Sequence, residues 1–143
     1  MASKSKVYFF IDNVDVQIKN KRRLKQVLET LFKKEKKNLE SLNYVFCSDK
    51  KLLKINQEYL HHDYYTDIIT FNLSKEKEEI NAEAYISLDR IKDNAAKLNL
   101  PVKEEIYRVI FHGALHLCGY KDKSKKQKLE IRKLEDYYLS RMF

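Results

Sequence analysis

The sequence is poor in the residues and runs that mark secreted, disulfide-rich and membrane-spanning proteins. Only two cysteines, Cys47 and Cys118, occur in 143 residues, which excludes a disulfide framework and favours a reducing compartment. No apolar run approaches the roughly 18 residues of a membrane-spanning helix, and residues 1–6 lack the apolar core of a secretion signal. We therefore expect a cytoplasmic protein with no membrane partner.

Glycine and proline are scarce as well, with two glycines and one proline in the whole chain. No linker, internal repeat or low-complexity tract separates one part of the chain from another. Hydrophobic residues make up 43% of the chain and include seven Phe and ten Tyr, which suffices for a core without a partner. We expect residues 1–143 to form a single domain.

Positive charge is a clear bias of the composition. Lysine and arginine number 29 against 21 aspartate and glutamate residues, which gives a formal net charge of +8. A basic chain is attracted to polyanions because binding releases their counterions, and nucleic acid is the polyanion we expect first. The alternative is that the excess lysine only solvates a helix end, as in the run at residues 33–37.

Hydrophobic periodicity predicts an α+β fold, in which a small mixed sheet of about four strands packs with about five helices. The expected strands lie at residues 6–11, 42–46, 68–73 and 84–88. The clearest helix runs from about 20 to 37, and the others begin after Ser48 or Asp49, after Asp89, at Pro101 and after Ser124. Ser124 and Gln127 can form a capping box for the last helix. The apolar residues that this helix is expected to bury are Leu129, Leu134 and Tyr138.

The helix that begins at Pro101 carries the most informative pattern in the chain. His112 and His116 are four residues apart, so their imidazoles lie on one face and can point at one ion. Glu105 and Arg108 fall in the same narrow stripe, and apolar residues flank it on both sides, which indicates a cleft along a mostly buried helix. Gly113 inside the helix costs roughly 1 kcal/mol against alanine, which indicates close packing there.

Two ligands do not make a strong metal site, and the chain beyond the helix offers a third. Gly119 can adopt the left-handed conformation that ends a helix and reverses the chain, which places Asp122 beneath the histidines. Imidazole and carboxylate suit Zn²⁺ and other divalent first-row metals, and three protein ligands leave one position open, as in a catalytic centre. The alternative is a polar surface stripe, with Asp122 as an ordinary loop residue or helix cap.

Two segments carry a resemblance to a known family. The run from His112 to Tyr120, His-Gly-Ala-Leu-His-Leu-Cys-Gly-Tyr, resembles the His-Gly-x-Leu-His-Leu-x-Gly-Tyr signature of the YbeY family of metal-dependent endoribonucleases. Upstream, Asn56-Gln-Glu-Tyr59 and residues 63–71 are similar to the family's Asn-x-x-Tyr-Arg and Pro-Thr-Asp-Val-Leu-Ser-Phe segments. The similarity is clear from about residue 50 to residue 125.

The resemblance implies a zincin-like fold, one Zn²⁺ or other divalent ion per chain, and cleavage of single-stranded RNA. It makes His112, His116 and Asp122 the metal ligands, and we assign catalytic roles to His112, His116 and Arg108. The implied partners are ribosomal RNA and the small ribosomal subunit, through maturation of the 3′ end of small-subunit ribosomal RNA and quality control of damaged ribosomes. No DNA specificity is expected.

Two positions depart from the family pattern. The family usually continues Gly-Tyr-Asp-His, whereas Lys121 and Asp122 follow Tyr120 here, so a carboxylate takes the place of the third histidine. Its negative charge should lower the Lewis acidity of the ion and shift the preference toward harder cations. Leu60 stands where the family commonly has an arginine, and we assign the missing positive charge to Arg108 or a neighbouring lysine.

The resemblance also predicts an edge strand beside the metal helix, for which residues 84–88 are the candidate. Glu83, just ahead of that strand, aligns with an acidic residue of the family and either approaches the metal cleft or lies at a solvent-facing strand end. Cys118 lies near the ligands in sequence, but it projects away from the histidine stripe. We therefore interpret it as a buried thiol, with metal binding or a nucleophilic role as the alternatives.

The segment before the third expected strand holds further candidates. Thr66 and Asp67 are expected to orient a ligand histidine through a hydrogen bond. His61 and His62 either contact RNA, act as proton donors, or are simply solvated in a polar loop.

The chemistry expected of such a centre is hydrolysis, because a metal with an open position lowers the pKa of its water and polarises a phosphoryl or carbonyl oxygen. Metallopeptidases with His-Glu-x-x-His keep a general-base glutamate after the first histidine, where this chain has Gly113. Together with the basic charge and the family resemblance, that difference favours single-stranded RNA as substrate. Two alternatives are a non-catalytic RNA- or ribosome-binding factor with a structural metal, and a metallopeptidase that uses Glu105 as its base.

Overall fold

The structure is a computed structural model that describes residues 6–143; residues 1–5, in the segment expected to lack a secretion signal, lie outside the described residues. The elements of the described chain are, in order, β1 (Val7–Ile11), α1 (Lys21–Lys34), β2 (Asn38–Cys47), α2 (Asp49–Leu60), β3 (Ile68–Asn72), β4 (Glu79–Ser87), α3 (Leu88–Leu98), α4 (Val102–Leu117) and α5 (Lys125–Ser140). None of these helices is long and apolar enough to cross a membrane. The predicted α+β fold is confirmed.

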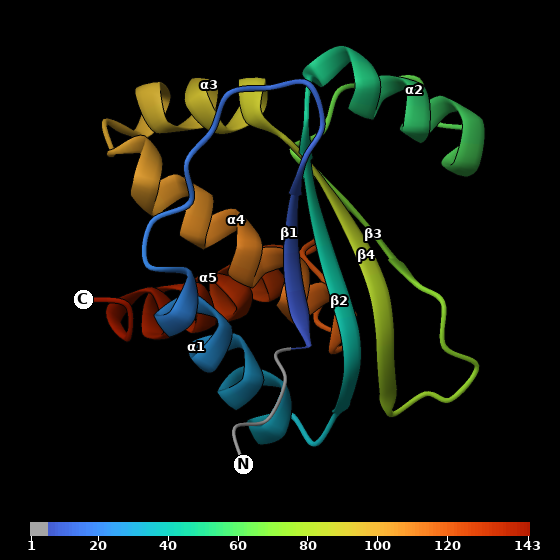
Figure 1. The fold of residues 1–143 in the computed structure, drawn as a ribbon, viewed down its shortest axis with the longest axis vertical. Helices are drawn as coiled ribbons and strands as arrows, with labels where there is room; N and C mark the ends of the chain where they lie inside the picture. The colour runs from blue at the N-terminus through green and yellow to red at the C-terminus, as the bar shows by residue number, and fades with distance from the viewer. Residues whose placement is uncertain (1–5) are drawn as a thin grey trace.

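The strands form one mixed sheet in the order β1-β2-β4-β3. β1 and β4 both pair with β2 in parallel, and β3 pairs antiparallel with β4. Figure 1 shows α1, α4 and α5 on one side of this sheet and α2 on the other. β1 and β3 stand at the two ends of the strand order, so they are the edge strands.

Alternation along the strands gives the sheet two different faces. Ala82, Ala84 and Ile86 of β4 are buried in the large core together with residues of α1, α4 and α5. Tyr85, between two of them, packs instead with a smaller apolar cluster that includes Leu52 of α2. The helix that carries His112 and His116 therefore packs on one face of the sheet, and α2 on the other.

α4 is held tightly against the sheet. Nearly all of its residues from Glu105 to Leu115 are buried, and the Tyr44 hydroxyl of β2 donates a hydrogen bond to the Ile110 carbonyl (2.9 Å). A Cβ atom at Gly113 would lie 2.5 Å from Cδ1 of Ile68 in β3. The close packing predicted at Gly113 is confirmed, because the end of the Ile68 side chain occupies the space that a Cβ atom would need.

The expected identity of the edge strand is wrong. Residues 84–88 belong largely to β4, which lies in the interior of the sheet between β2 and β3. The strand beside the metal helix is β3, because its antiparallel pairing with β4 places it at the outer edge, where Ile68 and Thr70 meet α4 at Gly113. β4 also begins earlier than expected, at Glu79, because its pairing with β2 extends to that residue.

Serine side chains cap α2, α3 and α5. Ser48 accepts a backbone hydrogen bond at the start of α2 (3.1 Å), and Ser124 forms the predicted capping box with Gln127. The cap of α3 is Ser87, which accepts a backbone hydrogen bond at 3.2 Å, and not Asp89 as predicted. The helix starts directly after the last residue of β4, so Asp89 already lies inside its first turn.

The buried face of α5 differs from the predicted one at its first position. Leu129 is 58% exposed, so its predicted burial is wrong, whereas Tyr138 is buried as predicted. Ile131 and Glu135 are the other buried residues of this helix. α5 therefore turns a carboxylate, and not only apolar side chains, toward α4.

Candidate metal centre

The side chains of His112, His116 and Asp122 converge at the C-terminal end of α4, and we call them the metal trio. One ligand atom from each lies within 4.8 Å of the other two, and residues 6–143 contain no second such group of three. The Nε2 atoms of the histidines are 2.8 Å apart. Oδ2 of Asp122 lies 3.3 Å from Nε2 of His112 and 3.6 Å from Nε2 of His116. The structure thus brings together the residues that the sequence pattern predicted.

The spacing of these atoms fits one divalent ion. Zinc–ligand distances of about 2.0–2.2 Å in a tetrahedral site place neighbouring ligand atoms roughly 3.3 Å apart. The observed separations of 2.8, 3.3 and 3.6 Å lie on both sides of that value. Two imidazoles and one carboxylate also form a donor set that binds Zn²⁺ and similar metals. The residues present therefore fit the implied metal, with fewer donors than a structural zinc site uses.

Hydrogen bonds at the other ring nitrogen orient both histidines. Nδ1 of His112 hydrogen bonds to Oε2 of Glu135 from α5, and Nδ1 of His116 lies 2.8 Å from the carbonyl oxygen of Tyr120. A carbonyl oxygen only accepts, so Nδ1 of His116 carries the proton, and a carboxylate acceptor favours the same tautomer of His112. Both Nε2 lone pairs are then directed at the metal position.

The turn after α4 positions Asp122. Gly119 has a φ angle of +104°, in the region that favours glycine, and its N–H donates a helix-ending hydrogen bond to the His116 carbonyl (2.9 Å). The Tyr120 hydroxyl donates to the carboxylate of Glu35 in the loop after α1 (3.0 Å). The chain reversal predicted from Gly119 is confirmed, and Tyr120 anchors it to the rest of the fold.

A cavity of about 410 Å³ opens beside the metal trio, and we call it the metal cavity. His112 and Asp122 form part of its wall, together with side chains from α3, α4 and α5. Glu105 and Arg108 of α4 also line it, so the polar stripe predicted along this helix does face a cleft. The cavity gives a bound molecule access to His112 and Asp122, two of the three predicted ligands.

Arg108 lies in the metal cavity among carboxylates. Its Nε atom is 3.3 Å from Oε1 of Glu105, and its Nη1 atom is 3.6 Å from Oε1 of Glu135 and 3.9 Å from Oδ1 of Asp136. These contacts are ion pairs without hydrogen-bond alignment, because Nε, Nη1 and the Glu105 oxygen are buried and make no hydrogen bond. Arg108 therefore neutralises part of the buried acidic charge while its donors stay incompletely engaged.

The carboxylates around His112 determine its protonation. Burial lowers its pKa, but the hydrogen bond and charge of Glu135, followed by the charges of Asp67 and Asp122, raise it above the usual value. Burial raises the pKa of Asp67 and of Glu105, and the charges of His112 and Arg108 oppose these two shifts. The acidic charge gathered at His112 favours a cation at this position.

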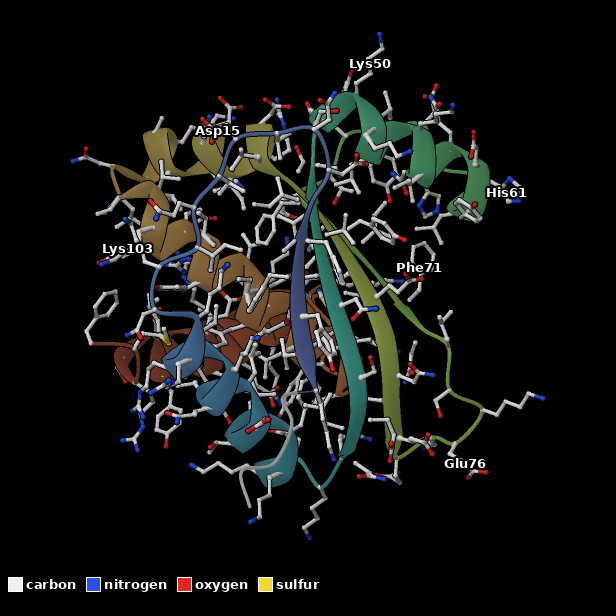
Figure 2. All side chains as sticks on the ribbon, viewed as in Figure 1. Asp15, Lys50, His61, Phe71, Glu76 and Lys103 are labelled. Atoms are coloured by element: carbon white, nitrogen blue, oxygen red, sulfur yellow. The ribbon has the colours of Figure 1, made fainter. Side chains whose placement is uncertain are left out.

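Several other candidates lie away from the metal trio. Glu83 alternates with the buried alanines of β4, so it projects from the opposite face of the sheet and lines a separate cavity of about 500 Å³ with Tyr85. Leu60 and His61 end α2, and Figure 2 shows His61 on the α2 side of the molecule, away from α4. His62 stacks on a neighbouring tyrosine ring. Of the two alternatives for Glu83, a position in the metal cleft is therefore excluded.

Glu135, and not Asp67, makes the hydrogen bond that we expected to orient a ligand histidine. Asp67 lines the metal cavity, but its Oδ2 accepts a hydrogen bond from Asn94 (3.5 Å), whereas Glu135 is the residue bonded to His112. The available sequence signal was the spacing of Glu135 from Ile131, which places this carboxylate on the buried face of α5. A charged residue at such a position needs a partner, and here the partner is a predicted ligand.

Cys118 follows the end of α4 and is not part of the metal trio, and it is partly buried rather than fully buried as interpreted. Burial and then the charge of Glu35 raise the pKa of its thiol to about 12, so the reactive thiolate is disfavoured at neutral pH. We expect Cys118→Ala to retain its metal, and native Cys118 to be alkylated by iodoacetamide at least about tenfold more slowly than the unfolded chain. Mass spectrometry and elemental analysis measure both. Loss of the metal in this variant, or fast alkylation of the native thiol, would make Cys118 a ligand or nucleophile.

Comparisons with known proteins agree with the resemblance in the sequence. The chain matches the family model described as "Endoribonuclease YbeY" over residues 9–143. A Cytophaga hutchinsonii protein named endoribonuclease YbeY is 47% identical over 134 residues, which cover 94% of this chain and 94% of that protein. A Porphyromonas gingivalis protein of the same name is 42% identical over 132 residues, which cover 92% of this chain and 87% of that protein.

A solved structure also resembles this one. It is the solution structure of a Thermotoga maritima protein, which superposes with a TM-score of 0.63 at 26% sequence identity. The superposition covers 94% of this chain and 87% of the other. The same arrangement of sheet and helices therefore occurs, over almost the whole chain, in a second protein.

Proposed function

This chain belongs to the YbeY family of endoribonucleases, and we propose that it cleaves single-stranded RNA with one divalent ion held by His112, His116 and Asp122. The proposed ion is Zn²⁺. The observation that carries this proposal is the convergence of three donor atoms within 4.8 Å of one another. His112 and Asp122 lie in the wall of a cavity, and both histidines are on a helix whose other residues are mostly buried.

The ion supplies Lewis acidity for phosphodiester hydrolysis when it is bound. The residues of the chain hold and orient it: Glu135 and the Tyr120 carbonyl fix the two imidazoles, and Asp122 contributes the third donor. Arg108 places a positive charge in the same cavity, where it can stabilise negative charge that develops on the phosphate. The family commonly has an arginine at the position of Leu60, and we assign the catalytic role of that missing arginine to Arg108.

The geometry around Gly113 supports RNA over peptide as the substrate. The position directly after the first histidine, where such peptidases keep their general-base glutamate, is Gly113 here, and a Cβ atom there would lie 2.5 Å from Cδ1 of Ile68, so the Ile68 side chain would have to move to admit a glutamate. Glu105, the alternative base, is buried and 3.3 Å from the guanidinium of Arg108, which favours a structural role. The net charge of +8 adds attraction for the RNA backbone.

The proposed biological setting is the maturation of ribosomal RNA. Family membership and the basic charge support ribosomal RNA and the small ribosomal subunit as partners, with the 3′ end of small-subunit ribosomal RNA as the cleavage region. Two unpaired cysteines fit the reducing cytoplasm as the compartment. The proposed unit is one domain over residues 1–143, and the single sheet of the described chain, with its helices, supports it.

The experiment that tests the proposal compares four substrates with zinc-loaded protein: single-stranded RNA, the same sequence as duplex RNA, single-stranded DNA and an unstructured peptide. We expect cleavage of the single-stranded RNA alone, abolished by chelation and restored by Zn²⁺. RNA binding without cleavage at any metal loading would favour a non-catalytic binding factor. Peptide cleavage without RNA cleavage would favour a metallopeptidase.

A further inference from the structure

The metal cavity has a basic part that the proposed hydrolysis does not use. Lys97 of α3 and Lys128 and Arg132 of α5 line it in addition to Arg108. Lys97, Lys128 and Arg132 are all exposed, whereas Arg108 is largely buried. A cavity that reaches His112 and Asp122 therefore carries three accessible positive charges from two further helices.

The acidic groups of the same cavity wall are already engaged. Glu135 is bonded to His112, Glu105 is paired with Arg108, and Asp67 accepts from Asn94. The exposed charges that are left in the wall, apart from Asp122 of the metal trio, are positive. An entering molecule thus meets the cations first.

Two of these basic side chains make few polar contacts within the protein. Lys128 and Arg132 are four residues apart, so they lie on the same face of α5. The side chain of Lys128 has no ion-pair or hydrogen-bond partner among residues 6–143. Arg132 has one contact there, from Nη1 to Oε1 of Glu135 at 4.0 Å, and its side chain is 48% exposed. Both side chains are available to a ligand.

We propose that this part of the cavity binds a second phosphate of the RNA, that of the nucleotide next to the scissile bond, with Lys128 and Arg132 as its contacts. The inference rests on the proposed function, because the ligand is the same RNA strand that reaches the metal trio. An arginine fork and a lysine ammonium are suited to a phosphate, whose oxygens accept several charge-assisted hydrogen bonds. The subsite would hold the strand while the neighbouring phosphate lies at the metal trio.

The test uses dinucleoside monophosphates, which contain only the scissile phosphate, and the same molecules with an added 5′ or 3′ terminal phosphate. Their 2′-O-methyl forms are titrated into zinc-loaded, ¹⁵N-labelled protein, and their unmodified forms give KM and kcat. We expect one of the two added phosphates to tighten binding about tenfold. The variant Lys128→Ala with Arg132→Ala should lose that gain, with a raised KM and an unchanged kcat.

The matched control is Lys126→Ala with Lys133→Ala, which removes two exposed lysines of α5 that do not line the cavity. The control variant should still bind more tightly when the terminal phosphate is present. Both double variants lose two positive charges, so the general attraction for polyanions falls equally in both, and only a specific phosphate contact distinguishes them. Equal loss in both variants, no gain from either terminal phosphate, or equally tight binding of an acidic dipeptide would overturn the subsite. If the wild type cleaves RNA but a terminal phosphate does not tighten binding, the phosphate subsite is rejected and the proposed function stands. If a terminal phosphate tightens binding but nothing is cleaved, the proposed function is rejected and the phosphate subsite stands.

Discussion

Asp122→Ala is expected to bind zinc at least about 100-fold more weakly than the wild type and to lose RNA cleavage with it. The physical reason is that Asp122 is the proposed third donor, 3.3 and 3.6 Å from the two Nε2 atoms, and two imidazoles alone make a weak site. Removal of its carboxylate also removes negative charge that favours a cation beside His112. Zinc affinity by chelator competition and the cleavage rate, measured on the same protein, check this result.

Two controls accompany Asp122→Ala. Asp122→His supplies the imidazole that the family signature usually has at this position, and we expect it to bind zinc at least as tightly as the wild type. Asp15→Ala removes the same charge from an exposed position in the loop between β1 and α1, as Figure 2 shows, and should change neither property. An Asp122→Ala protein that still holds one tight zinc ion would contradict the three-ligand site.

Glu135→Ala is expected to weaken zinc binding by roughly 10–100-fold while the protein stays folded. The carboxylate of Glu135 accepts from Nδ1 of His112, so its loss frees the ring to rotate and to adopt the other tautomer. It also removes one of the three carboxylates that pair with Arg108, the one 3.6 Å from Nη1. Zinc affinity and the visible spectrum of the Co²⁺-loaded protein measure the change at the metal directly, independent of activity.

The comparison variants for Glu135 separate charge from position. Glu135→Gln keeps an oxygen that can accept from His112 but loses the charge, so we expect an affinity between those of the wild type and Glu135→Ala. Glu130→Ala removes an exposed carboxylate of the same helix and should bind zinc normally. If Glu135→Ala binds zinc as tightly as Glu130→Ala and gives the same Co²⁺ spectrum, Glu135 does not position His112.

The predicted ligands could be found from the sequence because they are close together in the chain. One helical turn relates His112 to His116, and one glycine turn brings Asp122 to them, so local geometry alone fixes their convergence. The same holds for the Ser124–Gln127 capping box, which involves a single helix end. Contacts between residues a few positions apart can be predicted because the geometry of one helix turn or one chain reversal determines them.

Contacts between distant segments could not be predicted in the same way. Glu135 reaches His112 across 23 residues, and its pattern on α5 shows burial without showing the partner. The sequence predicted β4 and not β3 as the edge strand beside α4 for a similar reason. The alternation of residues along a strand does not reveal whether it is an edge or an interior strand. Gly113 predicted a close approach, but Ile68 as its neighbour follows only from the strand order.

The most direct test of the proposed metal dependence is a zinc titration of chelator-treated wild-type protein, with bound zinc and cleavage of single-stranded RNA measured on every sample. We expect both to rise together and to level off at about one ion per chain. Full RNA cleavage by protein that holds no metal would contradict the assignment of His112, His116 and Asp122 to a catalytic centre. So would saturation of these ligands with zinc, or with another divalent metal, without any cleavage.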